Sequence, residues 1–288
     1  MKLALGTVQF GLPYGISNQG GKVAREEVSH ILKLARASGI DTLDTAIAYG
    51  DSEACLGAVG TQGFKLVTKL PDFTDEVSDL YSWVQNQVNA SMRRLGVDSL
   101  YGLLLHNPQN LLGPQGQSLA KALYQLKSHG LVQKVGVSIY SPCELDTLMQ
   151  VLNVDLVQAP LNLIDQRLVT SGWLQRLHDQ GVEVHTRSAF LQGLMLMRRE
   201  TIPEKFSPWS QLFDHWHAWL NERGVSAAEA CLGFVASNPQ VDRIVVGVEN
   251  CEQLHELLQA TLKDPTQNLP DLLCSDDRLT VPLNWNYL

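Results

Sequence analysis

The sequence predicts an α/β fold, a closed (β/α)8 or TIM barrel that residues 1–288 form as a single domain. Eight strand-like segments alternate with helical patterns along the chain. The strands are apolar on both faces, as in parallel sheets that helices cover. Eight such units within about 250 residues fit one barrel. The alternative is a doubly wound sheet, but no GxGxxG motif follows the first strand to favour it.

The predicted elements follow one another in a regular order. Strands are expected at residues 2–7, 40–45, 64–70, 99–106, 132–139, 154–160, 182–190 and 243–248. Helices are expected at residues 25–39, 51–60, 76–96, 116–129, 142–151, 171–180, 209–223, 226–237 and 250–262. In the first helix, apolar residues recur at helical spacing at Val28, Ile31, Leu32 and Ala35. Residues 263–288 contain prolines without clear periodicity, and we expect this tail to lie against the barrel.

Composition and charge exclude several classes of function. The net charge is −8 and no Lys/Arg block stands out, which argues against a nucleic-acid partner. No apolar run approaches the ~20 residues that a membrane helix needs, and the N-terminus reaches glycine too early for a signal peptide. The cysteines are odd in number and form no CxxC motif, so we expect reduced thiols in a cytoplasmic protein. The sequence does not predict an oligomeric state.

Ionisable residues end three consecutive predicted strands. Asp44, Lys69 and His106 end the second, third and fourth strands, and Tyr49 lies just beyond Asp44. Each alone has an ordinary explanation, as a solvated lysine, a structural histidine, a capping acid or a packing tyrosine. In a barrel, however, the carboxyl ends of the strands meet at one rim. There Asp44 can hold the Lys69 ammonium, which favours the phenolate form of Tyr49. Tyr49 can then protonate a developing alkoxide while His106 orients the same oxygen.

Four segments carry a family resemblance. "GTVQFG", "DTAIAYGDSE", "LVTKL" and "LLLHNP" are similar to the signature segments of the aldo-keto reductases, and the resemblance extends over residues 3 to about 260. It implies that Asp44, Tyr49, Lys69 and His106 form the catalytic tetrad. It also implies hydride transfer from a nicotinamide to an aldehyde or ketone, with Tyr49 as general acid. Because the first predicted strand begins at once, we expect this chain to lack the N-terminal hairpin that often closes the barrel bottom in this family.

The resemblance also implies residues that hold the nicotinamide end of the cofactor. The family's Ser-Asn pair after the fifth strand corresponds to Ser138 and Ile139, and its glutamine on the sixth strand to Gln158, with Asn162 as another polar candidate. Where the family often places an aromatic that stacks on the nicotinamide, this chain has Arg187. A guanidinium can also stack on a ring; alternatively it contacts an acidic substrate group or pairs with an acid at the rim.

Two further segments are expected to bind the phosphates and the adenosine end. The backbone of Phe190, Leu191 and Gly193 should face the pyrophosphate. After the last strand, Asn250 and Gln253 have the spacing of a helix cap whose N–H groups can bind phosphate. NADPH-preferring relatives usually supply Lys or Arg in this segment. This chain instead offers Gly247, Val248, Glu249, Asn250 and Gln253. Family habit thus favours NADP(H), whereas Glu249 suits the ribose hydroxyl of NAD(H).

Other interpretations stay open at this point. Lys69 could form a Schiff base, as in an aldolase, or the chain could be a nicotinamide-binding sensor or scaffold without turnover. No metal is expected, because His215 and His217 point to different faces of a helix. The expected partner is a small carbonyl substrate. Its selectivity should lie in residues 10–22, in Asn107 and Pro108, in the 191–208 loop and in Trp285. The polar first loop hints at a sugar-like compound.

Overall fold

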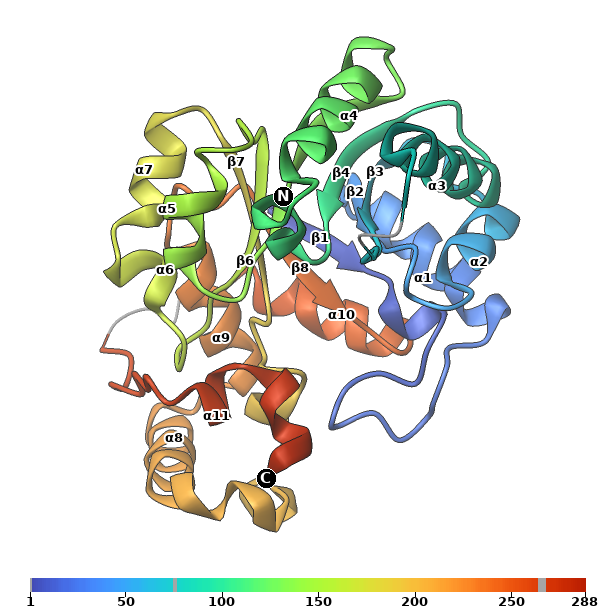
Figure 1. Cartoon of the computed structure of the whole chain (residues 1–288). Helices are drawn as coiled ribbons and strands as arrows, with labels where there is room; N and C mark the ends of the chain where they lie inside the picture. The colour runs from blue at the N-terminus through green and yellow to red at the C-terminus, as the bar shows by residue number, and fades with distance from the viewer. Residues whose placement is uncertain (1, 75–76, 264–267) are drawn as a thin grey trace.

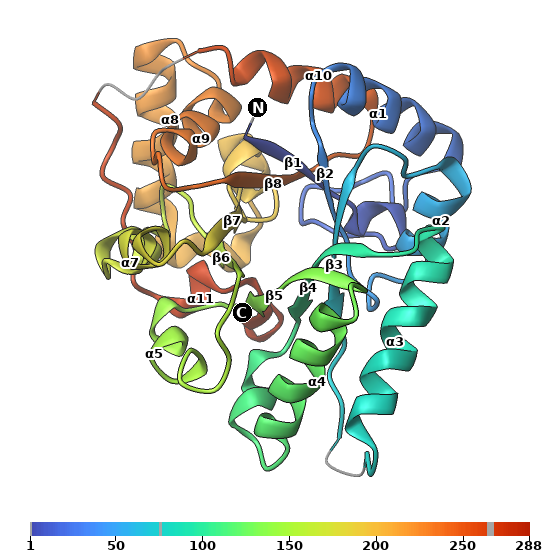
Figure 2. The ribbon, with the colours of Figure 1, turned by 90° about the horizontal axis from the view of Figure 1, so that it is seen from above.

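Eight parallel strands close into one barrel in the order β1 to β8, as a computed structural model that describes residues 2–74, 77–263 and 268–288 shows. The strands are β1 (Leu3–Gly6), β2 (Thr42–Asp44), β3 (Lys65–Leu70), β4 (Leu100–Leu105), β5 (Val132–Ser138), β6 (Leu156–Pro160), β7 (Glu183–Arg187) and β8 (Arg243–Gly247). The register Gly6↔Gly247 joins the last strand to the first. Seen from above, the strands form a ring inside a circle of helices (Figure 2). The predicted barrel is therefore confirmed.

The helices lie around or beside the barrel, and those that cover its strands present an apolar stripe to them. They are α1 (Arg25–Ala37), α2 (Ser52–Val59), α3 (Leu80–Leu95), α4 (Gly116–Ser128), α5 (Leu145–Leu148), α6 (Arg167–Thr170), α7 (Trp173–Asp179), α8 (Ser210–Arg223), α9 (Ala227–Ala236), α10 (Cys251–Ala260) and α11 (Asp277–Thr280) (Figure 1). In α1, Val28, Ile31, Leu32 and Ala35 are buried, as their spacing predicts. Within the described ranges, no helix has the length and apolarity to cross a membrane.

Some predicted boundaries were wrong. The strand expected at 182–190 ends at Arg187, because Ser188 has a left-handed backbone with φ of 62°. The single helix expected at 142–151 is a 3-10 turn, Pro142–Glu144, followed by the one-turn α5. The helix expected at 76–96 is observed as α3, which begins at Leu80. Residue 76, its expected start, lies outside the described residues, as do residues 264–267 of the predicted tail.

The barrel interior is built in layers. Val67, Leu104 and Leu156 form an apolar cluster of their own, apart from the larger core that lies between strands and helices. Side chains two positions apart share one face of a strand, so Lys69 follows Val67 toward the carboxyl end and Gln158 follows Leu156. Apolar packing in the middle thus separates polar side chains at the two ends of the barrel.

The described part of the tail packs beside α8 on the carboxyl side of the barrel (Figure 1). Trp219 of α8 donates a hydrogen bond to the Asn268 carbonyl at 2.9 Å. Trp285 is 5% exposed and packs edge-on against Phe206, with ring centroids 5.0 Å apart. These residues of the tail therefore pack against α8 and the segment before it. Trp285 serves packing rather than an open binding surface.

Candidate functional site

Buried hydroxyl groups fix the ends of β1 and β2, from which the site is built. Thr7 donates to the Asp44 carbonyl at 3.0 Å. Ser52, at the start of α2, donates to the Thr7 carbonyl at 2.8 Å and lies 3.1 Å from the Thr45 hydroxyl. These bonds hold the turn that carries Tyr49 between β2 and α2. A rigid support of this kind keeps functional side chains in one geometry.

Asp44, Lys69 and Gln158 form what we term the mouth network. The Lys69 ammonium lies 2.6 Å from the Asp44 carboxylate and 2.9 Å from the Thr45 carbonyl, and its side chain is 1% exposed. Gln158 donates to the other Asp44 oxygen at 2.7 Å. Burial alone would lower the pKa of Lys69, but Asp44 and Tyr49 together raise it above its ordinary value. The lysine is therefore held as a cation inside the barrel.

Tyr49 and His106 lie against this cation. The ammonium lies 5.1 Å from the centroid of the Tyr49 ring, and His106 meets that ring edge-on at 5.7 Å. Burial, and then the charge of Lys69, lowers the pKa of His106 to about 4, which keeps the imidazole neutral at physiological pH. The tetrad predicted from sequence thus comes together at one end of the barrel. A neutral imidazole and a phenol beside an ammonium can bind and protonate a carbonyl oxygen.

Close backbone packing holds Tyr49 in place. A Cβ added at Gly11 would lie 1.8 Å from the Tyr49 carbonyl oxygen, and one at Gly50 would lie 2.8 Å from the Gly11 carbonyl oxygen. Only glycine permits this approach between the first loop and the turn after β2. Gly11 was not recognised from sequence, since a glycine in a loop has no distinguishing local signal.

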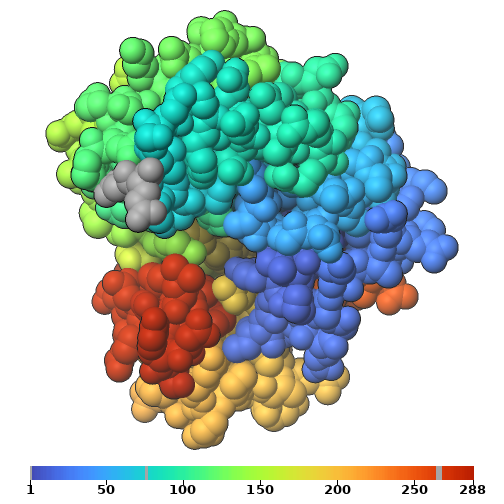
Figure 3. All heavy atoms as spheres, turned by 45° about the vertical axis from the view of Figure 1, so that its right-hand side comes forward, coloured from blue at the N-terminus to red at the C-terminus, as the bar shows by residue number. Residues whose placement is uncertain are grey.

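A cavity of about 500 Å³ extends from Asp44 and Tyr49 to the start of α10. This size is within the usual range for small-molecule sites. The residues predicted to bind cofactor that line it are Gln158, Arg187, Phe190, Gly193, Gly247, Glu249 and Gln253. Ser138, Leu191 and Asn250 are not among its lining residues. On the surface, the first loop and the tail face each other across a hollow above residues of the 190–220 region (Figure 3).

The first loop covers part of this cavity by contacting the segment after β7. Ile16 donates its backbone N–H to the Gln192 carbonyl at 3.1 Å, and Gln192 donates its side chain to the Tyr14 hydroxyl at 2.9 Å. A Cβ at Gly193, where φ is 92°, would lie 2.0 Å from the Ser17 hydroxyl. The two loops therefore close on each other, and glycine at position 193 is needed for that closure.

The start of α10 differs from the prediction that its N–H groups bind phosphate. Asn250 caps the helix by accepting from the Gln253 N–H at 2.8 Å, as its spacing indicates. However, the Gln253 side chain accepts from the Glu249 N–H, and Glu27 accepts from the Cys251 N–H at 2.7 Å. These donors already have protein partners, and one partner is a carboxylate from α1. Contacts from a distant helix cannot be read from local spacing.

Arg187 stacks on a neighbouring aromatic ring within the protein. Its guanidinium lies 4.4 Å from the centroid of the Tyr140 ring and donates to the Ile139 carbonyl at 2.9 Å. Tyr140 thus occupies one face of the guanidinium, where the sequence led us to expect the nicotinamide.

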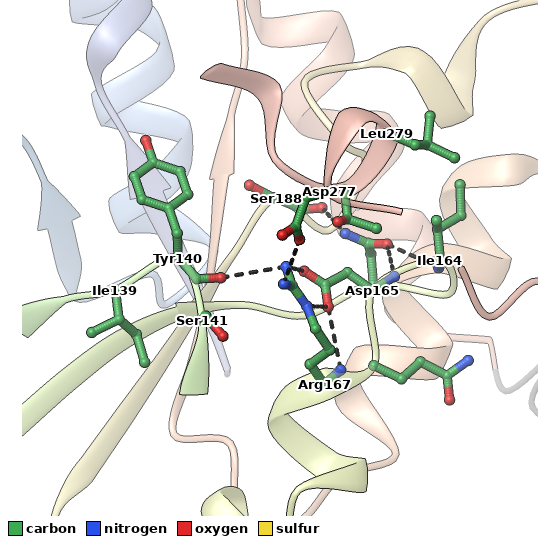
Figure 4. A network of polar contacts seen from close by, with 12 residues as sticks. Ile139, Tyr140, Ser141, Ile164, Asp165, Arg167, Ser188, Asp277 and Leu279 are labelled. Carbon is green, nitrogen blue, oxygen red and sulfur yellow. Dashed lines mark hydrogen bonds and ion pairs between the residues drawn. The ribbon is translucent and has the colours of Figure 1, made fainter. Parts of the chain in front are cut away.

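A second arginine holds the loops that carry this pair (Figure 4). Arg167 bonds Asp165 and Asp277 at 2.8 Å each and reaches the Tyr140 carbonyl at 3.4 Å. It thereby joins α11 of the tail to the segments after β5 and β6. Asn162, a sequence candidate for cofactor contact, is fully buried and donates instead to the Ser188 carbonyl at 3.0 Å. Asn162 therefore supports the turn after β7.

Three residues of this region were not named individually from the sequence, although Tyr14 lies in the 10–22 segment that was expected to determine selectivity. Gln9 lines the cavity, and its buried Oε1 has no hydrogen-bond donor among the described residues. Tyr14 also lines the cavity, and burial is the main reason that its pKa rises to about 12. Tyr140 carries the stacked guanidinium. All three lie in or beside loops, where periodicity gives no signal.

The predicted selectivity positions after β4 have local structural roles. Asn107 accepts from the Gln109 N–H at 3.2 Å and donates to Asp72, and Pro108 is buried. Within the described ranges, no group of three or more His, Cys, Asp or Glu side chains is arranged to hold a metal ion.

Known proteins share this sequence pattern and this architecture. Residues 2–268 match the model of the Aldo/keto reductase family. An aldo-keto reductase of Mycobacterium sp. (strain KMS) is 31% identical over 180 residues, which are 59% of this chain and 62% of that protein. A 6-dehydroglucose reductase of Agrobacterium fabrum (strain C58) is 26% identical over 252 residues, 78% of each. The match thus spans less than two thirds of the mycobacterial relative.

A solved structure shares the fold. An aldo-keto reductase from Bacillus halodurans, in its holo form, superposes with a TM-score of 0.71 over 92% of this chain and 88% of its own. The two sequences are 19% identical, so the likeness extends to the fold alone.

Proposed function

The chain belongs to the aldo/keto reductase family, and from this premise we propose that it reduces an aldehyde or ketone to an alcohol with a nicotinamide cofactor. The observation that carries the proposal is the buried Asp44–Lys69 pair, placed directly behind the Tyr49 ring. A bound dihydronicotinamide supplies the hydride that adds to the carbonyl carbon. Tyr49 supplies the proton that the carbonyl oxygen then needs.

Each member of the tetrad has a separate part in that proton transfer. Lys69 stabilises negative charge on the Tyr49 oxygen as the proton leaves. Asp44 and the Thr45 carbonyl fix the direction of the ammonium. Neutral His106, beside the Tyr49 ring, donates a hydrogen bond to the carbonyl oxygen and so directs it toward Tyr49. These steps require no metal and no covalent intermediate.

The residues around the cavity fit a nicotinamide dinucleotide. The amide of Gln9, whose Oε1 has no hydrogen-bond partner in the described part of the chain, lies against Gly247, where a Cβ would come within 2.5 Å of the Gln9 Nε2. Gln158 presents a second amide at the inner end. Gly193 and Phe190 line the wall between the two ends. The cavity lining combines these polar groups with apolar side chains, as small-molecule and cofactor sites do.

We assign NAD(H) as the preferred cofactor, against the family habit of NADP(H). The outer end of the cavity is lined by the carboxylates of Glu249 and Glu256, and its lining includes no lysine. Glu27 further occupies a backbone donor at the start of α10. A 2′-phosphate there would face like charges, whereas a ribose diol can donate to Glu249. Burial raises the pKa of Glu249, as expected for a carboxylate that lacks such a donor.

The substrate proposed here is a polyhydroxylated, sugar-like carbonyl compound. The related 6-dehydroglucose reductase of Agrobacterium fabrum acts, by its name, on a sugar-derived carbonyl. In this chain the mouth of the cavity is lined by hydrogen-bonding side chains, among them Tyr14, Ser17 and Gln192. We also place the protein in the cytoplasm, where its free cysteines would stay reduced.

A fluorescence titration followed by single turnover tests these proposals. We expect NADH to bind about tenfold more tightly than NADPH, because one or two repulsive contacts cost about 1–2 kcal/mol. Glu249→Arg should reverse the order, whereas Glu252→Arg, which adds the same charge on α10 away from the cavity lining, should not. Equal or tighter binding of NADPH by the wild type would refute the cofactor assignment.

The same sample then reports on turnover. Mixing the NADH complex with a panel of sugar-derived aldehydes should consume the dihydronicotinamide absorbance in a single exponential phase. Bound NADH that no carbonyl compound oxidises would instead indicate a cofactor-binding sensor. Trapping of Lys69 by borohydride in the presence of a ketone would indicate Schiff-base chemistry.

A further inference from the structure

The charges around the cavity are divided between its ends. Asp44 and Arg187 lie at the inner end with the catalytic residues, and Glu249 and Glu256 lie at the outer end. Asp44 is already paired with Lys69. Arg187 is the only arginine or lysine among the described residues that line the cavity. It is therefore the charge that an incoming ligand meets next to Tyr49.

Arg187 lacks the carboxylate partner that comparable arginines have. The other partly buried arginines each lie within ion-pair distance of an acid, as Arg94–Glu53, Arg167–Asp165, Arg199–Asp214 and Arg243–Asp41. Across residues 2–74, 77–263 and 268–288, no carboxylate lies within that distance of Arg187. Removing a cation from water without a counter-charge is unfavourable, which points to a ligand as the missing partner.

Hydrogen bonds to the protein fix the orientation of the Arg187 guanidinium. One Nη donates to the Ile139 carbonyl at 2.9 Å, and the other donates to the Ser188 hydroxyl at 3.3 Å. The Tyr140 ring covers one face. A guanidinium carries five N–H donors, so donors remain for a ligand. Preorganised donors bind with a smaller loss of side-chain entropy.

The charge of Arg187 influences the pKa values of two side chains near the catalytic residues. Burial and Lys69 are the main causes of the low pKa of His106, and Arg187 lowers it further. At Tyr14, whose pKa burial raises, Arg187 acts in the opposite direction. The cation of Arg187 therefore lies within electrostatic range of both His106 and Tyr14 of the first loop.

From this geometry we propose that Arg187 binds an anionic group of the substrate, so that the enzyme acts on acidic carbonyl compounds such as a sugar acid with an aldehyde or keto group. The inference rests on the proposed function for its reaction and adds the substrate class. A carboxylate can accept two parallel hydrogen bonds from a guanidinium, which also fixes its orientation. The anion would thereby set the position of the carbonyl relative to Tyr49.

The nicotinamide is a poorer partner for Arg187 than an anion is. Its oxidised ring carries a positive charge, and a guanidinium stacked on it would oppose the product state of the reduction. The cofactor pyrophosphate is the other anion that could reach this arginine. Measurement of NADH affinity in variants of Arg187 shows whether the arginine binds the substrate anion or the cofactor pyrophosphate.

A matched pair of polyols tests the proposal without turnover. Gluconate and glucitol have six carbons and differ in a carboxylate against a hydroxymethyl group. We expect calorimetric titration of the NADH-saturated protein to show gluconate binding about tenfold more tightly or better, as for one charge-assisted contact. Arg187→Met should abolish that difference. Arg198→Met, which removes the same charge from an exposed position, should preserve it.

A conservative variant distinguishes loss of the anion contact from a folding defect. Arg187→Lys keeps the charge without the planar fork, and it should retain part of the gluconate preference. Equal binding of gluconate and glucitol by the wild type would overturn the proposal. A large loss of NADH affinity in Arg187→Met, with the gluconate preference intact, would assign the arginine to the cofactor and overturn it as well.

Failure of the inference can be told from failure of the proposed function. We expect the NADH complex to reduce 4-carboxybenzaldehyde with a higher kcat/KM than benzaldehyde. Equal reduction of both would refute the anion site and leave the reductase intact. Reduction of neither, with tight gluconate binding that depends on Arg187, would refute the reductase and leave the anion site.

Discussion

The two ends of the barrel interior both hold a lysine–carboxylate pair, and the pair at the carboxyl end lies beside the cavity of about 500 Å³. At the amino end, Tyr101, Lys134, Glu183 and His185 form what we term the bottom network. Glu183 accepts from Tyr101 at 2.6 Å, lies 2.7 Å from His185 Nε2 and pairs with Lys134. At the carboxyl end, Asp44 and Lys69 pair beside Tyr49, and Asp44 lines the cavity.

The difference between the ends lies in what completes each network. Three protein groups surround Glu183, and they outweigh the effect of burial, so its pKa lies well below the ordinary value. The mouth network instead leaves Tyr49 and a neutral His106 beside a cavity, where a ligand can complete it. We therefore expect similar ion pairs to serve stability at one end and the proposed chemistry at the other.

The largest expected effect comes from removing the lysine of each network. Lys69→Met should lower single-turnover reduction by about 10³-fold or more, because Tyr49 loses the cation that stabilises its anion. It should also destabilise the fold, since Asp44 is left unpaired. Adding Asp44→Asn should restore stability without activity. Lys134→Met should lower stability only. Recovered turnover in the double variant would show that Lys69 serves stability at the mouth as well.

A smaller effect is expected from the bottom carboxylate. Glu183→Gln should reduce the free energy of unfolding by about 2–3 kcal/mol, between the values for exposed and fully buried pairs. Because the folded-state pKa of Glu183 is depressed, its stabilisation is complete above the ordinary carboxyl range and is lost as the pH falls through and below it.

Urea unfolding at neutral and acidic pH tests this prediction. The stability difference between wild type and Glu183→Gln should narrow on acidification, while the kcat of the variant stays within about twofold at neutral pH. A fall in kcat beyond that twofold range, in protein that is still folded at neutral pH, would show that the two ends of the barrel are coupled.

The contact between the two loops should have a more modest effect, on cofactor affinity. Gly193→Ala would place a Cβ 2.0 Å from the Ser17 hydroxyl at a φ of 92°. We expect NADH affinity to fall about tenfold, consistent with 1–3 kcal/mol of local strain. Gly130→Ala is the matched control, because its φ is 74° and no atom lies within 4 Å of the added Cβ. Equal NADH affinity in both variants would show that the contact between the two loops does not contribute to cofactor binding.

The smallest expected effect concerns His106, which should not titrate in the ordinary pH range of histidine. The pKa of His106 is lowered to about 4, so the imidazole should stay neutral from pH 8 down to about pH 5. Between pH 6.5 and 4 the unfolded chain binds a proton at His106 that the folded protein does not bind. The free energy of unfolding of the wild type should therefore fall over this range relative to that of His106→Gln. NMR of the His106 ring protons follows this directly. A titration midpoint near 6.5 would contradict a desolvated histidine at the mouth.

Sequence patterns predicted the barrel because its signals are local. Apolar strands and helical stripes identified the eight units, and residues that end neighbouring strands, such as Asp44 and Lys69, had to meet at one rim. Contacts between distant segments could not be predicted in this way. Glu27 at the start of α10 and Tyr140 on Arg187 are examples. The bottom network escaped notice because Glu183 and Lys134 sit within strands, where single charges resemble exposed positions.

The central claim is that Tyr49 donates the proton under the influence of Lys69. Its most direct test is single-turnover reduction by the NADH complex of Tyr49→Phe, with the exposed Tyr124→Phe as control. We predict a rate loss of about 10²–10⁴-fold in Tyr49→Phe with NADH affinity nearly unchanged. An undiminished rate of hydride transfer in that variant would contradict the account.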